Sequence, residues 1–166
     1  MKTPTFSART AVVIGAGIAA AAAIVPALAT PGSGFTPTSL SSGLFAALDV
    51  KADKTDKWDL FLKTEDRSTI AVDRLTVVPG GQSGWHTHAG VTLVTVTDGE
   101  VMWYDGENPL CTFATYRKGD GFVEPANHVH LVKNVSGSNA ELIAIQMRPV
   151  GTSPRIDANK PTNCSA

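Results

Sequence analysis

The chain has 166 residues, enough for one domain with its own core, and carries 14 lysine and arginine against 15 aspartate and glutamate residues. This near-neutral balance, without a basic patch in the sequence, argues against a nucleic-acid partner. The two cysteines, Cys111 and Cys164, suit a disulfide in an exported protein, although two unpaired thiols are the alternative.

Residues 1–29 are predicted to be a secretory signal peptide. Lys2 and Arg9 give it a basic start, residues 11–25 are apolar and uncharged, and an A-x-A cleavage pattern ends at Ala29. The apolar run is shorter than the ~20 residues that a membrane-spanning helix needs. We therefore expect a cleaved chain without a stable membrane span, secreted or held in the cell envelope; an uncleaved N-terminal anchor is the alternative. Cleavage removes two basic residues, which leaves 12 basic against 15 acidic residues.

Residues 30–57 are predicted to be a flexible leader and a first edge segment, because their first half is rich in proline, glycine, serine and threonine. Residues 58–150 alternate short valine-, threonine- and aromatic-rich segments with turn residues, and no period near 3.6 is sustained. Strands are predicted over 58–63, 69–78, 91–97, 100–104, 111–116, 121–123, 128–133 and 141–147. This pattern predicts a single all-β barrel or jelly roll, followed by a tail over 151–166.

Histidines recur at a spacing of two in this region. Side chains two residues apart in a strand share a face, so His86 and His88 would point to one side, as would His128 and His130. Two neighbouring strands could then bring His86, His88 and His130 to one point. Three imidazoles inside a barrel would hold a metal ion and leave positions open for water or substrate.

The surrounding residues resemble the two sequence motifs of the cupin superfamily. The glycine, histidine, proline and asparagine positions of these motifs fall on Gly80, His86, His88, Gly99, Gly119, Pro125, His130 and Asn134. The glutamate of the first motif falls on Thr92. The second glycine of the second motif falls on Asn127, a residue type that also tolerates positive φ.

The resemblance implies a single-domain cupin β-barrel, a double-stranded β-helix, of the small secreted bacterial type. It also implies a divalent transition metal on His86, His88 and His130, among which iron, zinc, manganese, nickel and copper are not distinguished. Thr92 in place of glutamate leaves three neutral ligands. This weakens a transfer of oxalate-type manganese chemistry but is compatible with the three-histidine dioxygenases of the superfamily. A homodimer is a further expectation from the resemblance.

Two residues are candidates for acid–base catalysis beside the ligands. Glu124 is the carboxylate nearest to His130 in sequence and a candidate general base. His128 shares the face of His130 and would act as a further ligand or an acid–base group, unless it is exposed at the start of its strand.

Other residues are assigned to the surroundings of the site. Thr92 would either orient a metal-bound water or simply pack, Gln82 would reach the rim of the pocket or remain in solvent, and Asn134 would tie its strand end to the neighbouring backbone. A bridge between Cys111 and Cys164 would tie the tail to the barrel.

Three functions remain open from the sequence. The first is an exported metal-dependent enzyme, most plausibly a dioxygenase-type oxidoreductase acting on a small organic molecule. The second is a non-catalytic module of the cell envelope that binds a small molecule or a metal. The third is a metal-free barrel with vestigial histidines.

Overall fold

The computed structural model describes residues 31–52 and 55–166, so the predicted signal peptide lies outside the described residues. Within these ranges no helix is long and apolar enough to cross a membrane. The described residues form twelve strands: β1 (Ser33–Phe45), β2 (Asp49–Lys51), β3 (Phe61–Lys63), β4 (Ser68–Gln82), β5 (His86–Thr87), β6 (Val91–Asp98), β7 (Glu100–Asp105), β8 (Phe113–Arg117), β9 (Gly121–Glu124), β10 (His130–Lys133), β11 (Ala140–Pro149) and β12 (Ile156–Asp157).

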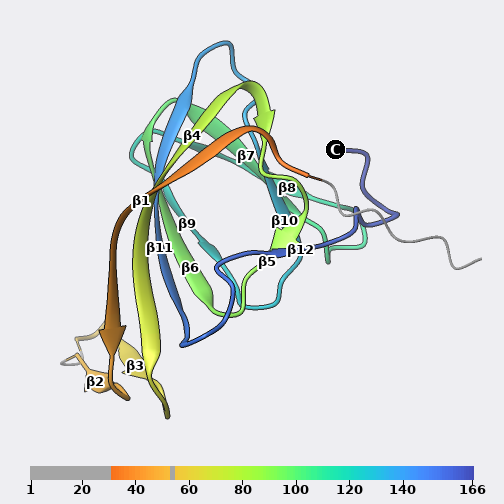
Figure 1. The fold of residues 1–166 in the computed structure, drawn as a ribbon. Coiled ribbons are helices and arrows are strands. Elements are labelled where there is room, and N and C mark those ends of the chain that lie inside the picture. Colours follow the sequence, from red (N-terminus) through yellow and green to blue (C-terminus); the bar gives the residue numbers. More distant parts are fainter. Residues whose placement is uncertain (1–30, 53–54) are drawn as a thin grey trace, which may run out of the picture.

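Ten of these strands form one antiparallel sheet that curls into a barrel (Figure 1). Its main path runs β12-β5-β10-β4-β11-β6-β9, with β1 added to β4, β7 to β10 and β8 to β7, while β2 and β3 form a separate pair. Figure 1 shows β2 and β3 beyond one end of the barrel, beside the ends of β1 and β4. The prediction of a single all-β cupin-type barrel is therefore confirmed.

Part of the predicted flexible leader, residues 33–45, is the long strand β1. It pairs with β4 from Phe45 opposite Ser68 to Ser33 opposite Gln82. Its serine- and threonine-rich composition suits an exposed edge strand, since the backbone ladder needs no apolar side chains to form. Phe35 packs against the barrel core and fixes the strand there. Composition alone indicated a linker because it carries no information about the partner strand.

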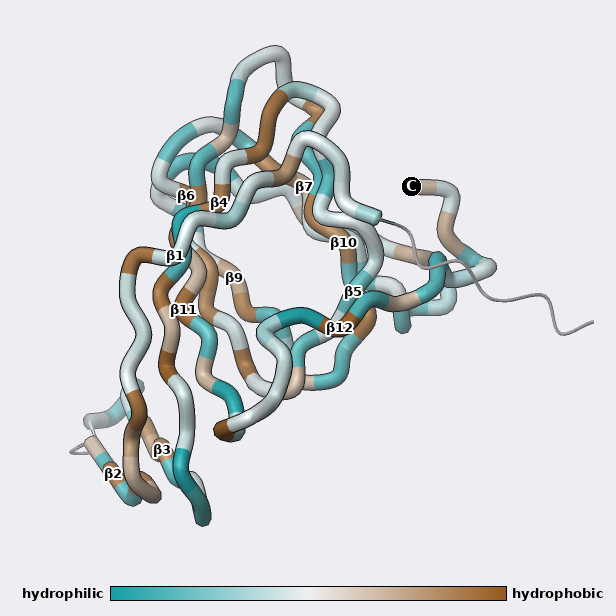
Figure 2. The backbone as a smooth tube through the Cα atoms, viewed as in Figure 1, coloured by the Kyte–Doolittle hydropathy of each residue, from teal (hydrophilic) through white to brown (hydrophobic). Residues whose placement is uncertain are grey.

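The core follows the alternation of side chains along the barrel strands. Figure 2 shows that hydrophobic residues recur along β6, β9 and β11. In β6, Thr92, Val94 and Val96 are buried while Val91 and Leu93 face outward, as the parity of the strand predicts. The buried cluster comprises Val77, Val94, Val96, Val101, Phe122, Val132, Ala140, Leu142 and Ala144.

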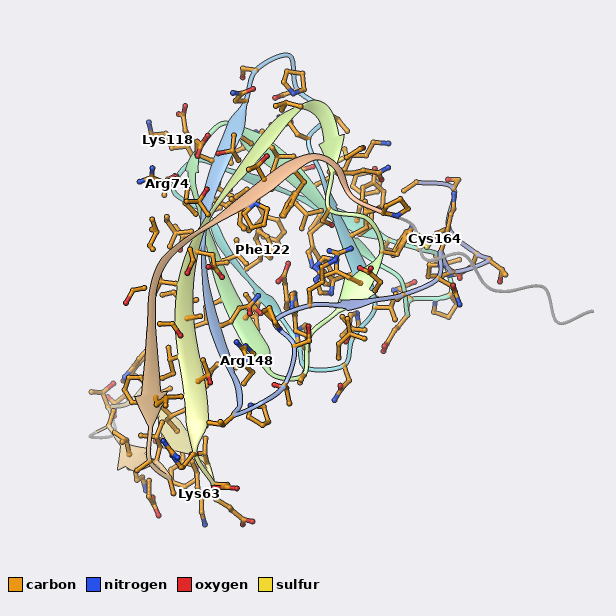
Figure 3. The ribbon with its side chains drawn as sticks, in the orientation of Figure 1. Lys63, Arg74, Lys118, Phe122, Arg148 and Cys164 are labelled. Atoms are coloured by element: carbon orange, nitrogen blue, oxygen red, sulfur yellow. A yellow bond between two sulfur atoms is a disulfide. The ribbon has the colours of Figure 1, made fainter. Side chains whose placement is uncertain are left out.

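The C-terminal tail is joined to the barrel by the predicted disulfide between Cys111 and Cys164, whose Cα atoms are 5.2 Å apart. Figure 3 shows Cys164 to one side of the barrel and Phe122 within it. Cys164 is buried with Trp85 and Leu131 in a second, smaller cluster. Earlier in the tail, β12 pairs with β5, so this segment forms part of the barrel wall.

The turn at Asn127 explains why asparagine can stand where the second motif has its second glycine. Asn127 has a φ of 57°, a left-handed conformation that glycine adopts most readily and asparagine tolerates. Asn127 also donates its backbone N–H to the carbonyl of His88 at 2.7 Å. Asparagine therefore serves at this position in the turn that leads from β9 towards β10.

Candidate metal centre

The barrel brings the three predicted ligand histidines together. His86 begins β5, His88 directly follows that strand, and His130 begins β10 opposite His86 in the sheet. All three are buried, and one ring nitrogen of each lies within 4.8 Å of those of the other two. The ring centroids are 4.3 to 5.2 Å apart. The geometric expectation drawn from the two sequence segments is therefore met.

Backbone carbonyls determine which nitrogen of each ring carries the hydrogen. A carbonyl oxygen only accepts, so each Nδ1 that bonds to one must donate a hydrogen. These bonds run from His86 to Gly84 at 2.9 Å, from His88 to Pro154 at 2.7 Å and from His130 to His128 at 2.8 Å. Each Nε2 is consequently left with a free lone pair when the ring is neutral. This is the tautomer and the support that metal-binding histidines require.

Glu124, predicted only as a candidate base, lies directly against these rings. Its carboxylate oxygens are 3.1 Å from Nε2 of His88 and 3.2 Å from Nε2 of His130, and its side chain is 6% exposed. Burial would raise the pKa of the Glu124 carboxyl, but its hydrogen-bonding and charge interactions with His130 and His88 outweigh burial and hold the pKa below its usual range.

His86 is uncharged at neutral pH. Burial, followed by the charges of His130 and Arg155, lowers the pKa of His86 from 6.5 to about 3. The nearby Glu124 carboxylate opposes this shift but is the weakest of the causes. A neutral imidazole is the form that binds a metal ion, so His86 does not have to lose a proton first.

In the metal-free protein, we expect the free energy of unfolding to decrease as the pH falls below 6.5. The folded state keeps His86 neutral down to a pKa of about 3, whereas the unfolded chain binds a proton near pH 6.5, so protonation favours unfolding in this range. Glu124, whose pKa is lowered by folding, adds to the loss only below about pH 4.5. Urea denaturation between pH 7 and pH 4.5 measures the slope. A His86→Gln variant with an undiminished slope would contradict the assignment.

The donor atoms fit a divalent transition-metal ion. The Nε2 atoms of His88 and His130 are buried without a hydrogen-bond partner in suitable geometry, and they lie 3.1 and 3.2 Å from the carboxylate oxygens of Glu124. Lone pairs on both sides repel unless a proton or a metal ion lies between them. Two donors that share an ion at about 2.0–2.2 Å lie roughly 3–3.5 Å apart, a range that includes both observed separations. Imidazole and carboxylate together suit zinc, iron or manganese.

A cavity of about 320 Å³ adjoins the cluster and is lined by His86, His88 and Glu124. Most of its remaining wall is apolar, formed by Phe35, Leu75, Val94, Phe122, Leu142 and Ala144. This volume and composition are typical of a site for a small organic molecule.

Besides the predicted Thr92, the cavity wall has polar groups that the sequence analysis did not identify. Thr92 and Gln146 face each other across β6 and β11, and the side-chain oxygen atom of each is buried without a hydrogen-bond partner. Pro154 and Arg155 join the lining from the C-terminal tail. The Arg155 guanidinium makes an ion pair with Asp157 at 2.7 Å. No motif covers this tail, so only the fold reveals its part in the site.

Three predicted residues lie outside both the cavity lining and the histidine cluster. His128 forms ion pairs with Asp105 at 2.8 Å and Glu107 at 3.2 Å. Gln82 ends β4 opposite Lys133. Asn134 is fully buried, and its amide donates to the carbonyls of Val77 and Ser138 while its oxygen accepts from Ser136. Through these contacts Asn134 joins its strand end to neighbouring backbone segments, which is the role expected from the sequence.

Comparison with known proteins finds similarity to cupin-domain proteins. A family model described as "Cupin domain" matches residues 73–146. Similar solved structures include a cupin domain from Bordetella pertussis Tohama I, with 18% identity, coverage of 63% of this chain and 95% of that chain, and a TM-score of 0.42. A cupin 2 conserved barrel domain protein from Leptotrichia buccalis has 20% identity, 69% and 41% coverage, and a TM-score of 0.46.

The polyketide cyclase RemF from Streptomyces resistomycificus is also similar, with 16% identity, coverage of 51% of this chain and 62% of that chain, and a TM-score of 0.43. The match spans less than two thirds of the Leptotrichia and Streptomyces chains. No curated protein matches this chain.

Proposed function

Because this chain belongs to the cupin superfamily, we propose that it is a metal-dependent dioxygenase-type oxidoreductase acting on a small organic substrate. His86, His88 and His130 would hold a divalent transition-metal ion. The observation that carries the proposal is the orientation of the three rings: backbone carbonyls hold each Nδ1–H, so every Nε2 is available to the same ion.

Bound iron would supply open coordination positions at which dioxygen and an oxygen donor of the organic molecule can meet. The residues of the chain would do the rest. The apolar wall around Phe122 and Leu142 would hold the carbon skeleton and exclude water. Gln146 would accept a hydrogen bond from the substrate, because its side-chain oxygen is buried without a donor.

We also propose that the protein works outside the cytoplasm. The Cys111–Cys164 disulfide supports this location, since such bridges persist mainly in oxidising compartments. The basic and apolar pattern of residues 1–29, with its cleavage pattern at Ala29, supports export by a signal peptide.

Elemental analysis of the protein folded without an affinity tag tests the metal site. We expect about one transition-metal ion per chain in the wild type, and none above background in His86→Ala, which removes a buried ligand. His128→Ala is the matched control, because its side chain contacts Asp105 and Glu107 while only its backbone carbonyl supports His130. Metal-free wild-type protein after refolding with iron, zinc and manganese would refute the proposal.

Oxygen consumption then tests the reaction class. The metal-loaded protein is expected to consume dioxygen with at least one member of a panel of catechols, flavonols and β-diketones, each of which offers two adjacent oxygen donors. His86→Ala should consume none above the rate of free metal. A loaded protein that binds these compounds without consuming oxygen would instead support the non-catalytic binding module.

A further inference from the structure

The family motif has its glutamate at position 92, where this chain has threonine. Thr92 is nevertheless fully buried on the inner face of β6, and its hydroxyl has no hydrogen-bond partner. A short side chain therefore occupies the place from which a carboxylate would reach the ion. The structure supplies a carboxylate to the same region by another route.

That route is the pairing of β6 with β9, in which Thr92 lies directly opposite Glu124. Directly opposed residues of antiparallel strands project to the same face with Cβ atoms about 4.5–5.5 Å apart. A carboxylate moved from one position to the other thus stays at the same level of the barrel. The short side chain of Thr92 also leaves room for Glu124 to reach across.

Among the described residues, the Glu124 carboxylate forms ion-pair contacts only with His88 and His130. The cationic side chain in the cavity lining, Arg155, is paired with Asp157 instead. The carboxylate oxygens lie 3.1 and 3.2 Å from the Nε2 atoms of His88 and His130, so a proton or a metal ion must lie between them. Neutral rings that donate from Nδ1 to backbone carbonyls cannot also donate a hydrogen from Nε2.

We propose that Glu124 is the fourth protein ligand of the metal ion, so that β9 supplies the carboxylate that the family motif places on β6. This inference rests on the proposed metal site and deepens it. Three neutral imidazoles leave a divalent ion with its full charge, whereas Glu124 reduces the charge of the complex by one. An anionic oxygen ligand shifts the preference of the site towards harder ions such as manganese, iron and zinc.

The first test replaces Glu124 with glutamine, which keeps the shape and removes the charge. We expect Glu124→Gln to bind zinc at least about 100-fold more weakly in a chelator competition, a larger effect than the 10–100-fold typical of residues that only support a ligand. Its cobalt-loaded form should show an altered visible spectrum. Glu141→Gln on β11 is the control for charge, because Glu141 contacts Thr76 and does not line the cavity. It should bind as the wild type does.

The second test exchanges the two facing residues. Glu124→Thr should lose zinc affinity as Glu124→Gln does, and combining it with Thr92→Glu should restore affinity to within about tenfold of the wild type, because the carboxylate returns from the opposite strand. Circular dichroism and the Tm of the metal-free forms show that each variant is folded.

The outcomes separate this inference from the proposed function. Wild-type affinity in folded Glu124→Gln, together with loss of metal in His86→Ala, would overturn the role of Glu124 and leave the three-histidine site intact. A wild type that binds no metal would overturn both. Failure of the exchanged double variant to recover, when it is folded, would contradict the equivalence of positions 92 and 124.

Discussion

Removing the bound ion with a chelator is expected to lower the Tm of the protein by roughly 10–20 °C. An ion at 1,000 times its Kd stabilises the folded state by about 4 kcal/mol, provided that the unfolded chain does not bind it. For a domain of this size, about 1 kcal/mol corresponds to roughly 4 °C.

Differential scanning calorimetry of the loaded and chelated protein measures this shift, and re-addition of the ion should reverse it. His130→Ala should show no metal-dependent shift, because it removes one of the three buried rings that would hold the ion. His128→Ala should shift as the wild type does. A Tm that is indifferent to metal in the wild type, or an undiminished shift in His130→Ala, would contradict the site.

Breaking the disulfide by Cys164→Ser is expected to lower the free energy of unfolding by about 4 kcal/mol. Cys111 and Cys164 are separated by 53 residues, and closing a loop of that length removes about 4 kcal/mol of conformational freedom from the unfolded chain. The buried position of Cys164 beside Trp85 and Leu131 adds a packing contribution that serine would weaken.

Urea denaturation of the metal-free protein measures this effect without contribution from the ion. The Cys111→Ser/Cys164→Ser double variant should match the single variant, and a reductant should destabilise only the wild type. A change of less than about 1 kcal/mol in Cys164→Ser would show that the unfolded chain gains little freedom when the bridge is absent.

Much of the barrel and its ligands can be predicted from the sequence because the relevant signals are local. The pattern of turn residues and alternating side chains gives β4 and β6 to β11, but not the two-residue strands β5 and β12. The spacing of two between His86 and His88 determines their common direction. Asn134 likewise fits the motif at a strand end, where its amide and oxygen satisfy nearby backbone groups and Ser136.

The remaining features depend on pairings between distant segments, which no local pattern encodes. β1 is a strand because β4 offers it a ladder, although its composition is that of a linker. Glu124 reaches the rings because β9 lies beside β6 in one particular register. The separation of Glu124 from Thr92 along the chain gives no indication that they are opposite each other.

The three rings also differ in how far along the chain their supporting carbonyls lie. The carbonyls that orient His86 and His130 lie two residues away from them, whereas the one that orients His88 belongs to Pro154, 66 residues later. The third imidazole is therefore oriented only when the segment around Pro154 packs against the barrel. Displacing that segment would disturb the metal centre without altering any of its three histidines.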